Sequence, residues 1–397
     1  MTKAVLYVGT YTQRLDHVDG KGQGVHAFEM DVATGALTPL SVLPVEQCGV
    51  NPSYVCCSAT AFSNTHKTLY AVNETDAQSA SSPSTTTGYV RAFAIEGRGV
   101  LRPLSTHETT GAWPCHVSIW DRAGPHGAFV AVSNYGGGSV ALYPIDSQDG
   151  SLRPACDVHA FAGASHVVPD RQEAAHVHSA TWLHQPGTAS LLVADLGNDR
   201  VAQLTLDADS KKLRPLSATP FLTRPPGSGP RHLTIHPTLR MVYVLDELSS
   251  TIGVHPIVDD VDQGGSVAPV AIQRISTLPS GFKDFNLGAD IHLSTCGRYL
   301  YASNRGHDSI ACFRVHTMPA TTDPHPHPRG WLELLGHTST RGAFPRGFLI
   351  YRDWLLVANQ NSDTIEVFQI DGDSGALRHS GHNVACPTPV SLCIPSE

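Results

Sequence analysis

A short pattern recurs along the whole chain and constrains its fold more than any other feature. In each copy an apolar strand ends on a polar residue. Seven copies end at Thr10, Asn73, Asn134, Asp195, Asp246, Asn304 and Asn359, at successive intervals of 63, 61, 61, 51, 58 and 55 residues. From the second copy onward, a polar turn and an alternating strand follow, which is a hairpin signature. A fixed period of this kind indicates a repeat architecture.

Two more strands complete each unit. An apolar strand precedes the pattern, as at residues 230–235 (PRHLTI), and Gly-x-Leu strands lie between the repeats, as at residues 35–40 (GALTPL). Seven units of about four strands each are the sequence form of a β-propeller. The composition agrees, because 16% charged residues with 35 Gly and 28 Pro suit short strands and tight turns better than helices. We therefore predict an all-β fold, a seven-bladed propeller with four-stranded antiparallel blades.

The two ends of the chain predict how the ring closes. The chain begins at the second strand of a unit and ends on the first strand of one, so residues 389–394 should pair with residues 4–10. One composite blade would then contain residues 4–42 and 388–394, and its closure would remove free sheet edges. No linker interrupts the period, so we expect residues 1–397 to form a single propeller domain.

Charge, the N-terminal residues and the cysteines limit the function classes. The formal net charge is -8 and no basic patch is evident, so nucleic acid is not an expected partner. The apolar run before Gly9 has only five residues, too short for a signal sequence or a membrane span. The nine cysteines contain no C-x-x-C pair and lie mostly in apolar strands, which favours buried, reduced thiols in a cytoplasmic protein.

Three polar insertions interrupt the repeat and are predicted to be surface loops. They cover residues 77–87, 259–265 and 318–328. The last contains a Pro-His-Pro-His-Pro run, for which metal binding is the alternative interpretation. Because no companion ligands lie near it in the sequence, we prefer an ordinary loop and expect no metal.

Polar residues that interrupt the apolar innermost strands indicate where a site lies, because these strands line the channel of a propeller. Aligning the strands on the turns that follow them places Cys115, His178, Arg231 and Arg346 at one equivalent position. The other polar residues of these strands and of the second-strand ends are His116, His176, His232, Asp290, His292, Asn73, Glu74, Asn134, Asp195, Glu247, Arg305 and Gln360. We predict that these groups form a ring of imidazole, guanidinium and carboxylate at one channel mouth.

A structural explanation competes with a functional one for several of them. His116, His232 and His292 alternate with apolar neighbours, which favours structural histidines. The Asn and Asp residues at the strand ends recur in nearly every unit, so the simplest interpretation is that they form turns by bonding their own backbone.

Four residues, His178, Arg231, Glu247 and Arg305, do not recur in every unit, and a functional role explains their charge better. Arginines converging from separate blades suit a phosphate or several carboxylates, because guanidinium offers charge-assisted donors in a fixed geometry. A His and a Glu beside them supply a proton acceptor and donor at neutral pH.

At these residues the sequence resembles the lactonase family of seven-bladed propellers, typified by cycloisomerase-type 6-phosphogluconolactonase and fungal carboxy-cis,cis-muconate cyclase. The resemblance covers nearly the whole chain. Among its most specific segments are residues 7–12 (YVGTYT), 134–140 (NYGGGSV), 169–179 (PDRQEAAHVHS), 229–233 (GPRHL), 246–251 (DELSST) and 301–310 (YASNRGHDSI).

The resemblance implies a site at one mouth of the channel, free of metal and cofactor. Its catalytic His falls on His178, its anion-binding arginines on Arg231 and Arg305, and its acid/base carboxylate on Glu247. The residues expected to bind substrate are His116, His176, Asp290, Arg346 and Gln360. One departure concerns substrate preference: many relatives read Pro-Arg-Asp-Phe where this chain has Gly347 as the third residue.

The expected activity is hydrolysis of 6-phospho-D-glucono-1,5-lactone to 6-phosphogluconate, with a small anionic substrate as the only partner. His178 or Glu247 would activate water while the arginines stabilise the oxyanion and hold the phosphate. Muconate-type cyclisation on the same scaffold is the alternative. A protein-binding scaffold is the non-enzymatic alternative, but the Trp-Asp dipeptide that closes each blade of one such class does not recur from blade to blade here. Oligomeric state and the residue that handles the proton stay open.

Overall fold

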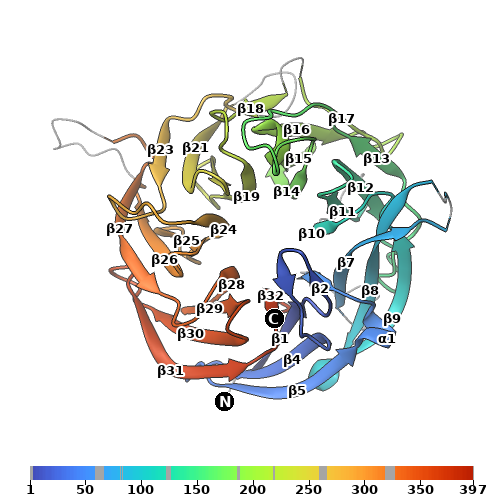
Figure 1. The fold of residues 1–397 in the computed structure, drawn as a ribbon, viewed down its shortest axis with the longest axis horizontal. Coiled ribbons are helices and arrows are strands. Elements are labelled where there is room, and N and C mark those ends of the chain that lie inside the picture. The colour runs from blue at the N-terminus through green and yellow to red at the C-terminus, as the bar shows by residue number, and fades with distance from the viewer. Residues whose placement is uncertain are drawn as a thin grey trace.

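Seven β-sheets surround a central channel like the blades of a propeller (Figure 1). The computed structural model describes residues 3–58, 67–80, 82, 84–121, 127–185, 188–217, 220–258, 266–317 and 327–396. Within these residues, α1 (Val45–Cys48) and two three-residue 3-10 turns are the helical elements. The predicted all-β, seven-bladed propeller is confirmed.

In each blade the strands run outward from the channel in chain order, all antiparallel. The innermost strands are β32 (Pro389–Cys393), β6 (Pro52–Cys57), β10 (Pro114–Trp120), β14 (Val177–Gln185), β19 (Pro230–Ile235), β24 (Leu287–Leu293) and β28 (Pro345–Tyr351). The second strands are β1 (Lys3–Thr10), β7 (Thr68–Gln78), β11 (Phe129–Asn134), β15 (Thr188–Asp195), β20 (Met241–Asp246), β25 (Tyr299–Arg305) and β29 (Trp354–Asn359).

The outer half of each blade is a further hairpin. The third strands are β4 (Gly24–Asp31), β8 (Thr86–Glu96), β12 (Ser139–Pro144), β16 (Arg200–Leu206), β21 (Thr251–Val258), β26 (Ser309–Val315) and β30 (Thr364–Ile370). The outermost strands are β5 (Leu37–Pro44), β9 (Val100–Glu108), β13 (Asp157–Ala160), β17 (Leu213–Pro215) with β18 (Phe221–Thr223), β22 (Ser266–Val267) with β23 (Gln273–Ser276), β27 (Leu332–Ser339) and β31 (Leu377–Ala385). A small hairpin of β2 (Arg14–Leu15) and β3 (Val18–Asp19) follows β1.

The ring closes as predicted. β32 pairs antiparallel with β1, with Tyr7 opposite Cys393 and Gly9 opposite Ser391, and β4 and β5 complete this blade. The first innermost strand of the ring therefore comes from the other end of the chain, as the colours of Figure 1 show.

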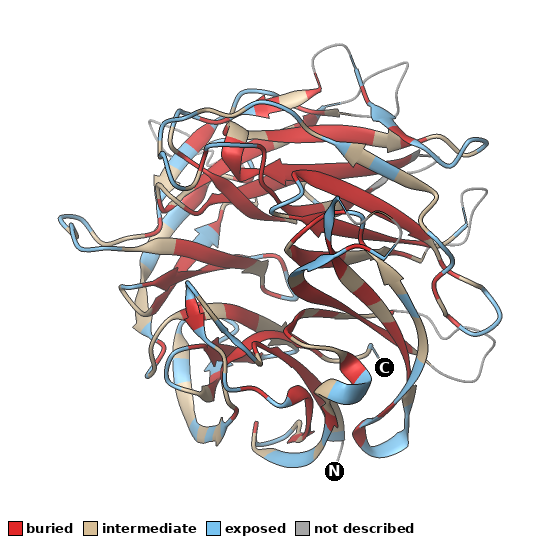
Figure 2. Cartoon of the chain, turned by 45° about the vertical axis from the view of Figure 1, so that its right-hand side comes forward, coloured by how far each residue is buried: buried red, intermediate tan, exposed pale blue. Residues whose placement is uncertain are grey.

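The second strands form the core between blades. Every residue of β11, β20 and β29 is buried, and Figure 2 shows that buried residues follow the strands while exposed ones gather at the turns. Equivalent tyrosines join neighbouring blades: Tyr70, Tyr243 and Tyr301 donate to the carbonyls of Gly150, Gly330 and Gly375 at 2.8, 3.0 and 2.8 Å. Burial with a satisfied hydroxyl stabilises these contacts.

Every innermost strand carries a β-bulge at the same level. In β19, Pro230 pairs with Asp246 and His232 with Leu245, so Arg231 is the extra residue. The extra residues of five other innermost strands are Ser53, Cys115, His178, Arg346 and Val390, while in β24 both Ala289 and Asp290 lie opposite Ser303. A bulge redirects side chains locally, and here it places one residue per blade at the channel.

Two sequence interpretations need correction. The insertion at residues 77–87 is not all loop, because Ala77 and Gln78 pair with Thr87 and Thr86 and lengthen the β7–β8 hairpin. Residues 259–265 and most of the insertion at 318–328 lie outside the described residues. The strand-end asparagines Asn73, Asn134, Asn304 and Asn359 donate to carbonyls outside their own turns, as Asn73 does to those of Cys48 and Val50, although Asn134 and Asn304 also donate to the serine side chain that ends their turn. These hydrogen bonds hold the segment that precedes the innermost strand of the same blade.

Candidate active site

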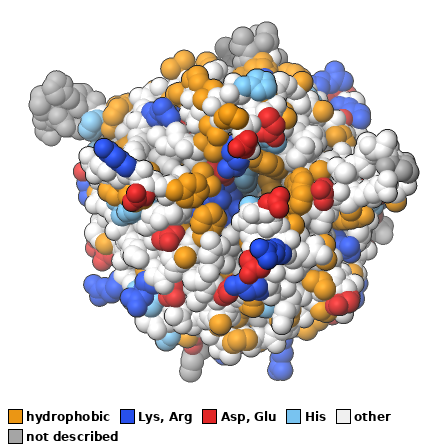
Figure 3. All heavy atoms as spheres, viewed as in Figure 1, with side chains coloured by type: hydrophobic (Ala, Val, Ile, Leu, Met, Phe, Trp, Pro, Cys, Tyr) orange, Lys and Arg blue, Asp and Glu red, His pale blue; other side chains and the backbone are white. Residues whose placement is uncertain are grey.

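The side chains at the bulges converge at the mouth where the innermost strands begin. The surface is hollowed at its centre on this face, and basic and histidine side chains lie in the hollow (Figure 3). A second ring of side chains comes from one residue at or near the end of each second strand. These residues are Tyr11, Glu74, Tyr135, Leu196, Glu247, Arg305 and Gln360. The site is built from these two rings.

Glu247 is the centre of one side of the site. Its side chain is 2% exposed, and its Oε2 lies 3.0 Å from Arg231 Nε and 2.9 Å from Arg305 Nη2. Its Oε1 accepts a hydrogen bond from Arg171 Nη2. Burial raises the pKa of Glu247, but the charges of Arg305, Arg171 and Arg231 outweigh it and hold that pKa well below its usual value. The carboxylate is therefore ionised.

The two ion pairs at Oε2 are close but not aligned as hydrogen bonds. Among the described residues, Glu247 Oε2, Arg231 Nε and Arg305 Nε have no hydrogen-bond partner although all three are buried. Buried polar atoms are normally satisfied. Of the three, Arg305 Nε also takes no part in either ion pair, so its N–H can donate to a ligand.

His178 lies beside this cluster. Its Nε2 is 3.7 Å from Glu247 Oε2, its Nδ1 is 3.7 Å from Cys115 Sγ, and Tyr135 packs edge-on against its ring. Burial, reinforced by the charge of Arg231, lowers the pKa of His178 well below its usual value. The imidazole is neutral, so one ring nitrogen can accept a proton.

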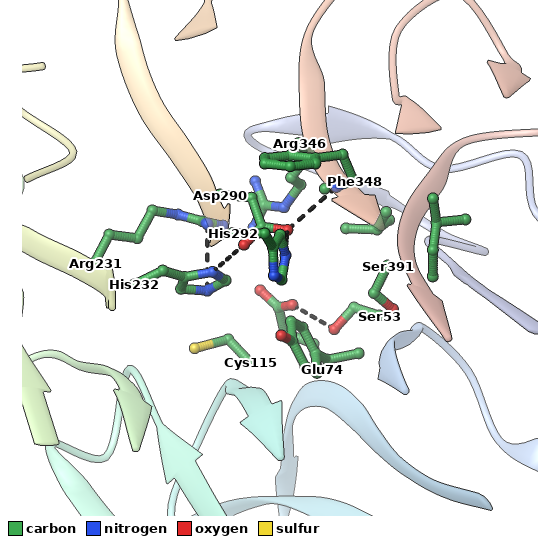
Figure 4. Close-up of a pocket in the computed structure, with 14 residues that line it drawn as sticks. Ser53, Glu74, Cys115, Arg231, His232, Asp290, His292, Arg346, Phe348 and Ser391 are labelled. Atoms are coloured by element: carbon green, nitrogen blue, oxygen red, sulfur yellow. Dashed lines mark hydrogen bonds and ion pairs between the residues drawn. The ribbon is translucent and has the colours of Figure 1, made fainter. Parts of the chain in front are cut away.

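A second cluster surrounds Arg346. Its Nη2 donates to Tyr11 Oη at 2.8 Å, and its guanidinium lies over the Tyr11 ring. Tyr11 Oη donates to Glu74 Oε2 at 2.8 Å. Ser53 Oγ donates to the same oxygen at 2.7 Å, a contact drawn in Figure 4. No carboxylate of the described residues lies within ion-pair distance of Arg346, so its remaining donors are open to an anionic group.

The structure thus brings together all four residues predicted to be catalytic. Arg346, predicted to bind substrate, joins them. His176 stacks on Tyr135 and bonds Glu173 Oε1 at 2.8 Å, away from Glu247. His116 packs against Tyr54 and His232.

Two further predicted substrate ligands are tied to other groups. Gln360 is 1% exposed and donates to Asn361 Oδ1. Asp290 bonds His232 and His292. Substrate contact by His116, His176, Asp290 and Gln360 stays a prediction.

Sequence reasoning missed Tyr11, Tyr135 and Arg171. The two tyrosines occupy the positions of Glu74 and Glu247 in their own blades, so the alignment that found the carboxylates contains them. Arg171 comes from the segment between β13 and β14, which has no strand pattern. Among the described residues, no group of three His, Cys, Asp or Glu is suited to a metal ion, and no helix is long and apolar enough to cross a membrane.

Comparison with known proteins places this site in context. A family model described as "Lactonase, 7-bladed beta-propeller" matches residues 5–394. The chain is 31% identical to the 6-phosphogluconolactonase of Bacillus subtilis (strain 168), over 99% of the chain and 98% of the relative, and 30% identical to a 6-phosphogluconolactonase of Formosa agariphila, over 94% of each. The structure of a periplasmic gluconolactonase from Pseudomonas aeruginosa aligns with a TM-score of 0.81 and 30% identity, covering 100% of this chain and 99% of that one.

Proposed function

Because the chain belongs to the family of seven-bladed β-propeller lactonases, we propose that its substrate is 6-phospho-D-glucono-1,5-lactone, hydrolysed to 6-phosphogluconate. Lactonase activity follows from the family. The choice of a phosphorylated lactone as the substrate needs a separate argument, because the relatives include both 6-phosphogluconolactonases and a gluconolactonase.

The charge balance of the site is the observation that carries the proposal. Four guanidiniums, from Arg171, Arg231, Arg305 and Arg346, outnumber the three carboxylates Glu247, Glu74 and Asp290, and Asp290 is itself paired with His232 and His292. His178 is neutral and adds none. A phosphate monoester carries about two negative charges at neutral pH. The site therefore matches a phosphorylated lactone better than an uncharged one.

The proposed chemistry assigns the proton to His178. Its neutral imidazole takes a proton from water, the water oxygen bonds the lactone carbonyl carbon, and arginine donors stabilise the oxyanion. Collapse of this intermediate breaks the ring C–O bond, and the imidazolium returns the proton to the leaving ring oxygen. Glu247 is less suited to accept this proton, because Arg171, Arg231 and Arg305 engage its two carboxylate oxygens. It instead stabilises the imidazolium and holds the arginines.

The phosphate is expected at Arg346, whose donors are not engaged by a carboxylate of the described residues. Muconate cyclisation and a protein-binding scaffold, the alternatives raised by the sequence, draw no support from the relatives reported above. No second function is therefore proposed.

The test compares two freshly prepared lactones, 6-phosphogluconolactone and glucono-1,5-lactone, each against its spontaneous opening. We expect kcat/KM to be at least about 10-fold higher for the phosphorylated lactone, since a charge-assisted contact is worth about 1.5–3 kcal/mol. Arg346→Met should reduce that preference, while the exposed surface variant Arg153→Met is the matched control. Equal kcat/KM for both lactones would exclude the phosphorylated substrate. No acceleration by folded protein would exclude lactonase activity itself.

We also propose a cytoplasmic location. All nine cysteines are free thiols, which suits a reducing compartment, whereas the Pseudomonas aeruginosa relative is described as periplasmic. Fractionation of source cells beside cytoplasmic and periplasmic marker enzymes would decide between the two, and recovery with the periplasmic marker would refute the proposal.

A further inference from the structure

Arg231 is held from two directions. Its Nε faces Glu247, while its Nη1 lies 3.3 Å from His232 Nε2 and also donates to the carbonyl of Ala289. Neighbouring residues of a regular strand point to opposite faces, but the bulge at Arg231 allows this arginine and His232 to meet. The contact is visible in Figure 4.

The contact with Arg231 fixes the protonation of His232. A guanidinium only donates hydrogen bonds, so His232 Nε2 must be the unprotonated nitrogen and Nδ1 must carry the proton. His232 Nδ1 lies 2.9 Å from Asp290 Oδ1, which accepts that proton's hydrogen bond. Burial, reinforced by Arg231, lowers the pKa of His232 to about 4. The ring is therefore neutral, and one tautomer satisfies both neighbours.

Asp290 is in turn held by groups from three blades, of which His232 is one. Oδ1 also accepts from the backbone N–H of Ile291 at 3.0 Å, and Oδ2 accepts from His292 Nε2 at 3.0 Å and from the Phe348 N–H at 3.2 Å. With four donors the carboxylate cannot turn away from His232. A continuous chain therefore runs from His292 through Asp290 and His232 to Arg231.

We propose that His232 and Asp290 are positioning residues that hold the Arg231 guanidinium in its working orientation. The proposal rests on the proposed function, in which Arg231 contacts the reacting group. His232 supplies an acceptor that directs one N–H bond of Arg231, and Asp290 holds His232 in the tautomer that makes this possible. This role requires no contact between the substrate and either residue.

Isosteric variants separate the two contacts. His232→Gln keeps an amide oxygen near the position of Nε2, facing Arg231, whereas His232→Asn keeps only a group near Nδ1, facing Asp290. Asp290→Asn places an amide N–H among donors and favours the tautomer in which His232 Nε2–H opposes Arg231. The matched control is Glu366→Gln, which changes a buried carboxylate that bonds His379 at 2.8 Å in an outer pair of strands.

For hydrolysis of 6-phosphogluconolactone we expect kcat/KM to fall about 10- to 100-fold in Asp290→Asn and His232→Asn, because small misplacements of a positioned group cost about that much. His232→Gln should lie within about threefold of the wild type, and Glu366→Gln should match it. In an Arg231→Met background, Asp290→Asn should cause little further loss, since coupled residues are not additive. Full additivity, or Asp290→Asn as active as Glu366→Gln, would overturn the proposal.

Long-range 1H–15N spectra of histidine-labelled protein provide a readout that needs no catalysis. His232, assigned by its absence in His232→Gln, should show the Nδ1–H tautomer in the wild type and the Nε2–H tautomer in Asp290→Asn. An Nε2–H tautomer in the wild type would overturn the proposal even in an active enzyme. If the wild type accelerates no lactone but shows the expected tautomers, the proposed function fails while the positioning of Arg231 stands.

Discussion

Replacement of Glu247 by Gln should expose how strongly this carboxylate holds the arginines. Gln keeps the shape and removes the charge, so Arg231 and Arg305, which are 4% and 3% exposed, lose their counter-ion. Leaving a buried charge unpaired costs about 3–5 kcal/mol. Arg171 is 31% exposed and remains partly hydrated, which favours the lower end, about 3 kcal/mol. With an unfolding entropy of about 2.1 cal/mol/K per residue over 397 residues, Tm should fall by about 4 °C.

The same substitution should turn the site into a better binder of anions. Loss of this carboxylate raises the excess positive charge of the site by one, so inorganic phosphate should raise the Tm of Glu247→Gln more than that of the wild type, by mass action on the folded state. Calorimetry or dye-based melting with and without phosphate measures this. Asp246→Asn is the matched control, because Asp246 is paired bidentately with Arg224 in the same blade at 0% and 1% exposure, outside the site. It should lose similar stability without gaining a response to phosphate.

The stability that the Glu247 ion pairs contribute depends on pH with a definite sign. Because the pKa of Glu247 is held low in the folded protein, its ion pairs stabilise the fold above about pH 4.5 and this stability is lost as pH falls through the folded pKa. Glu247→Gln should therefore lose less stability on acidification than the wild type. An unchanged Tm at neutral pH, or an equal phosphate response in Asp246→Asn, would refute this account of the charge balance.

His178→Gln should lower kcat about 100- to 10,000-fold with little change in KM, as expected for loss of a general base, and a normal kcat would remove His178 from the proposed chemistry. His292→Gln should change how stability depends on pH: burial lowers the pKa of His292 but Asp290 raises it further, so its pairing stabilises the fold below about pH 6.5 and is lost as pH rises through the folded pKa. Melts at pH 6 and pH 8.5 should therefore differ more in the wild type than in the variant. Deletion of residues 389–397 removes β32 and leaves the inner edge of β1 unpaired, so cooperative melting should be lost, whereas deletion of 395–397 should be tolerated.

The fold was predictable because one physical signal repeats seven times. Each unit carries the same order of apolar strand, polar end and turn, and the incomplete units at the two ends could only be completed by each other. Local errors arose where a strand continues beyond its pattern. Residues 77–87 read as a polar loop, yet backbone pairing extends the hairpin through Gln78 and Thr86 regardless of side-chain polarity.

The candidate site was predictable only where its residues occupy repeat positions. His178, Arg231 and Arg346 share the bulge position, so aligning the strands was sufficient. Arg171 depends instead on how an irregular segment packs: the next residue, Gln172, donates to Leu196 O and Asp199 Oδ1 at 2.8 Å. No period in the sequence encodes such contacts. The partners of Asp290 come from three innermost strands, and the pattern of residues along one strand does not predict such contacts either.

The ring of bulges separates the backbone pairing, which repeats in every blade, from the side chain at the extra residue, which differs from blade to blade. The extra residue of each bulge is left out of the backbone pairing of its blade, so its side chain can change without removing a hydrogen bond of the ladder. Three of the seven sectors hold small or uncharged side chains here, Ser53, Cys115 and Val390. A charged side chain introduced at one of these three bulge positions would face the same substrate from a different blade. Seven equivalent bulge positions thus surround one site, and a substitution at any of them is a route to a new specificity.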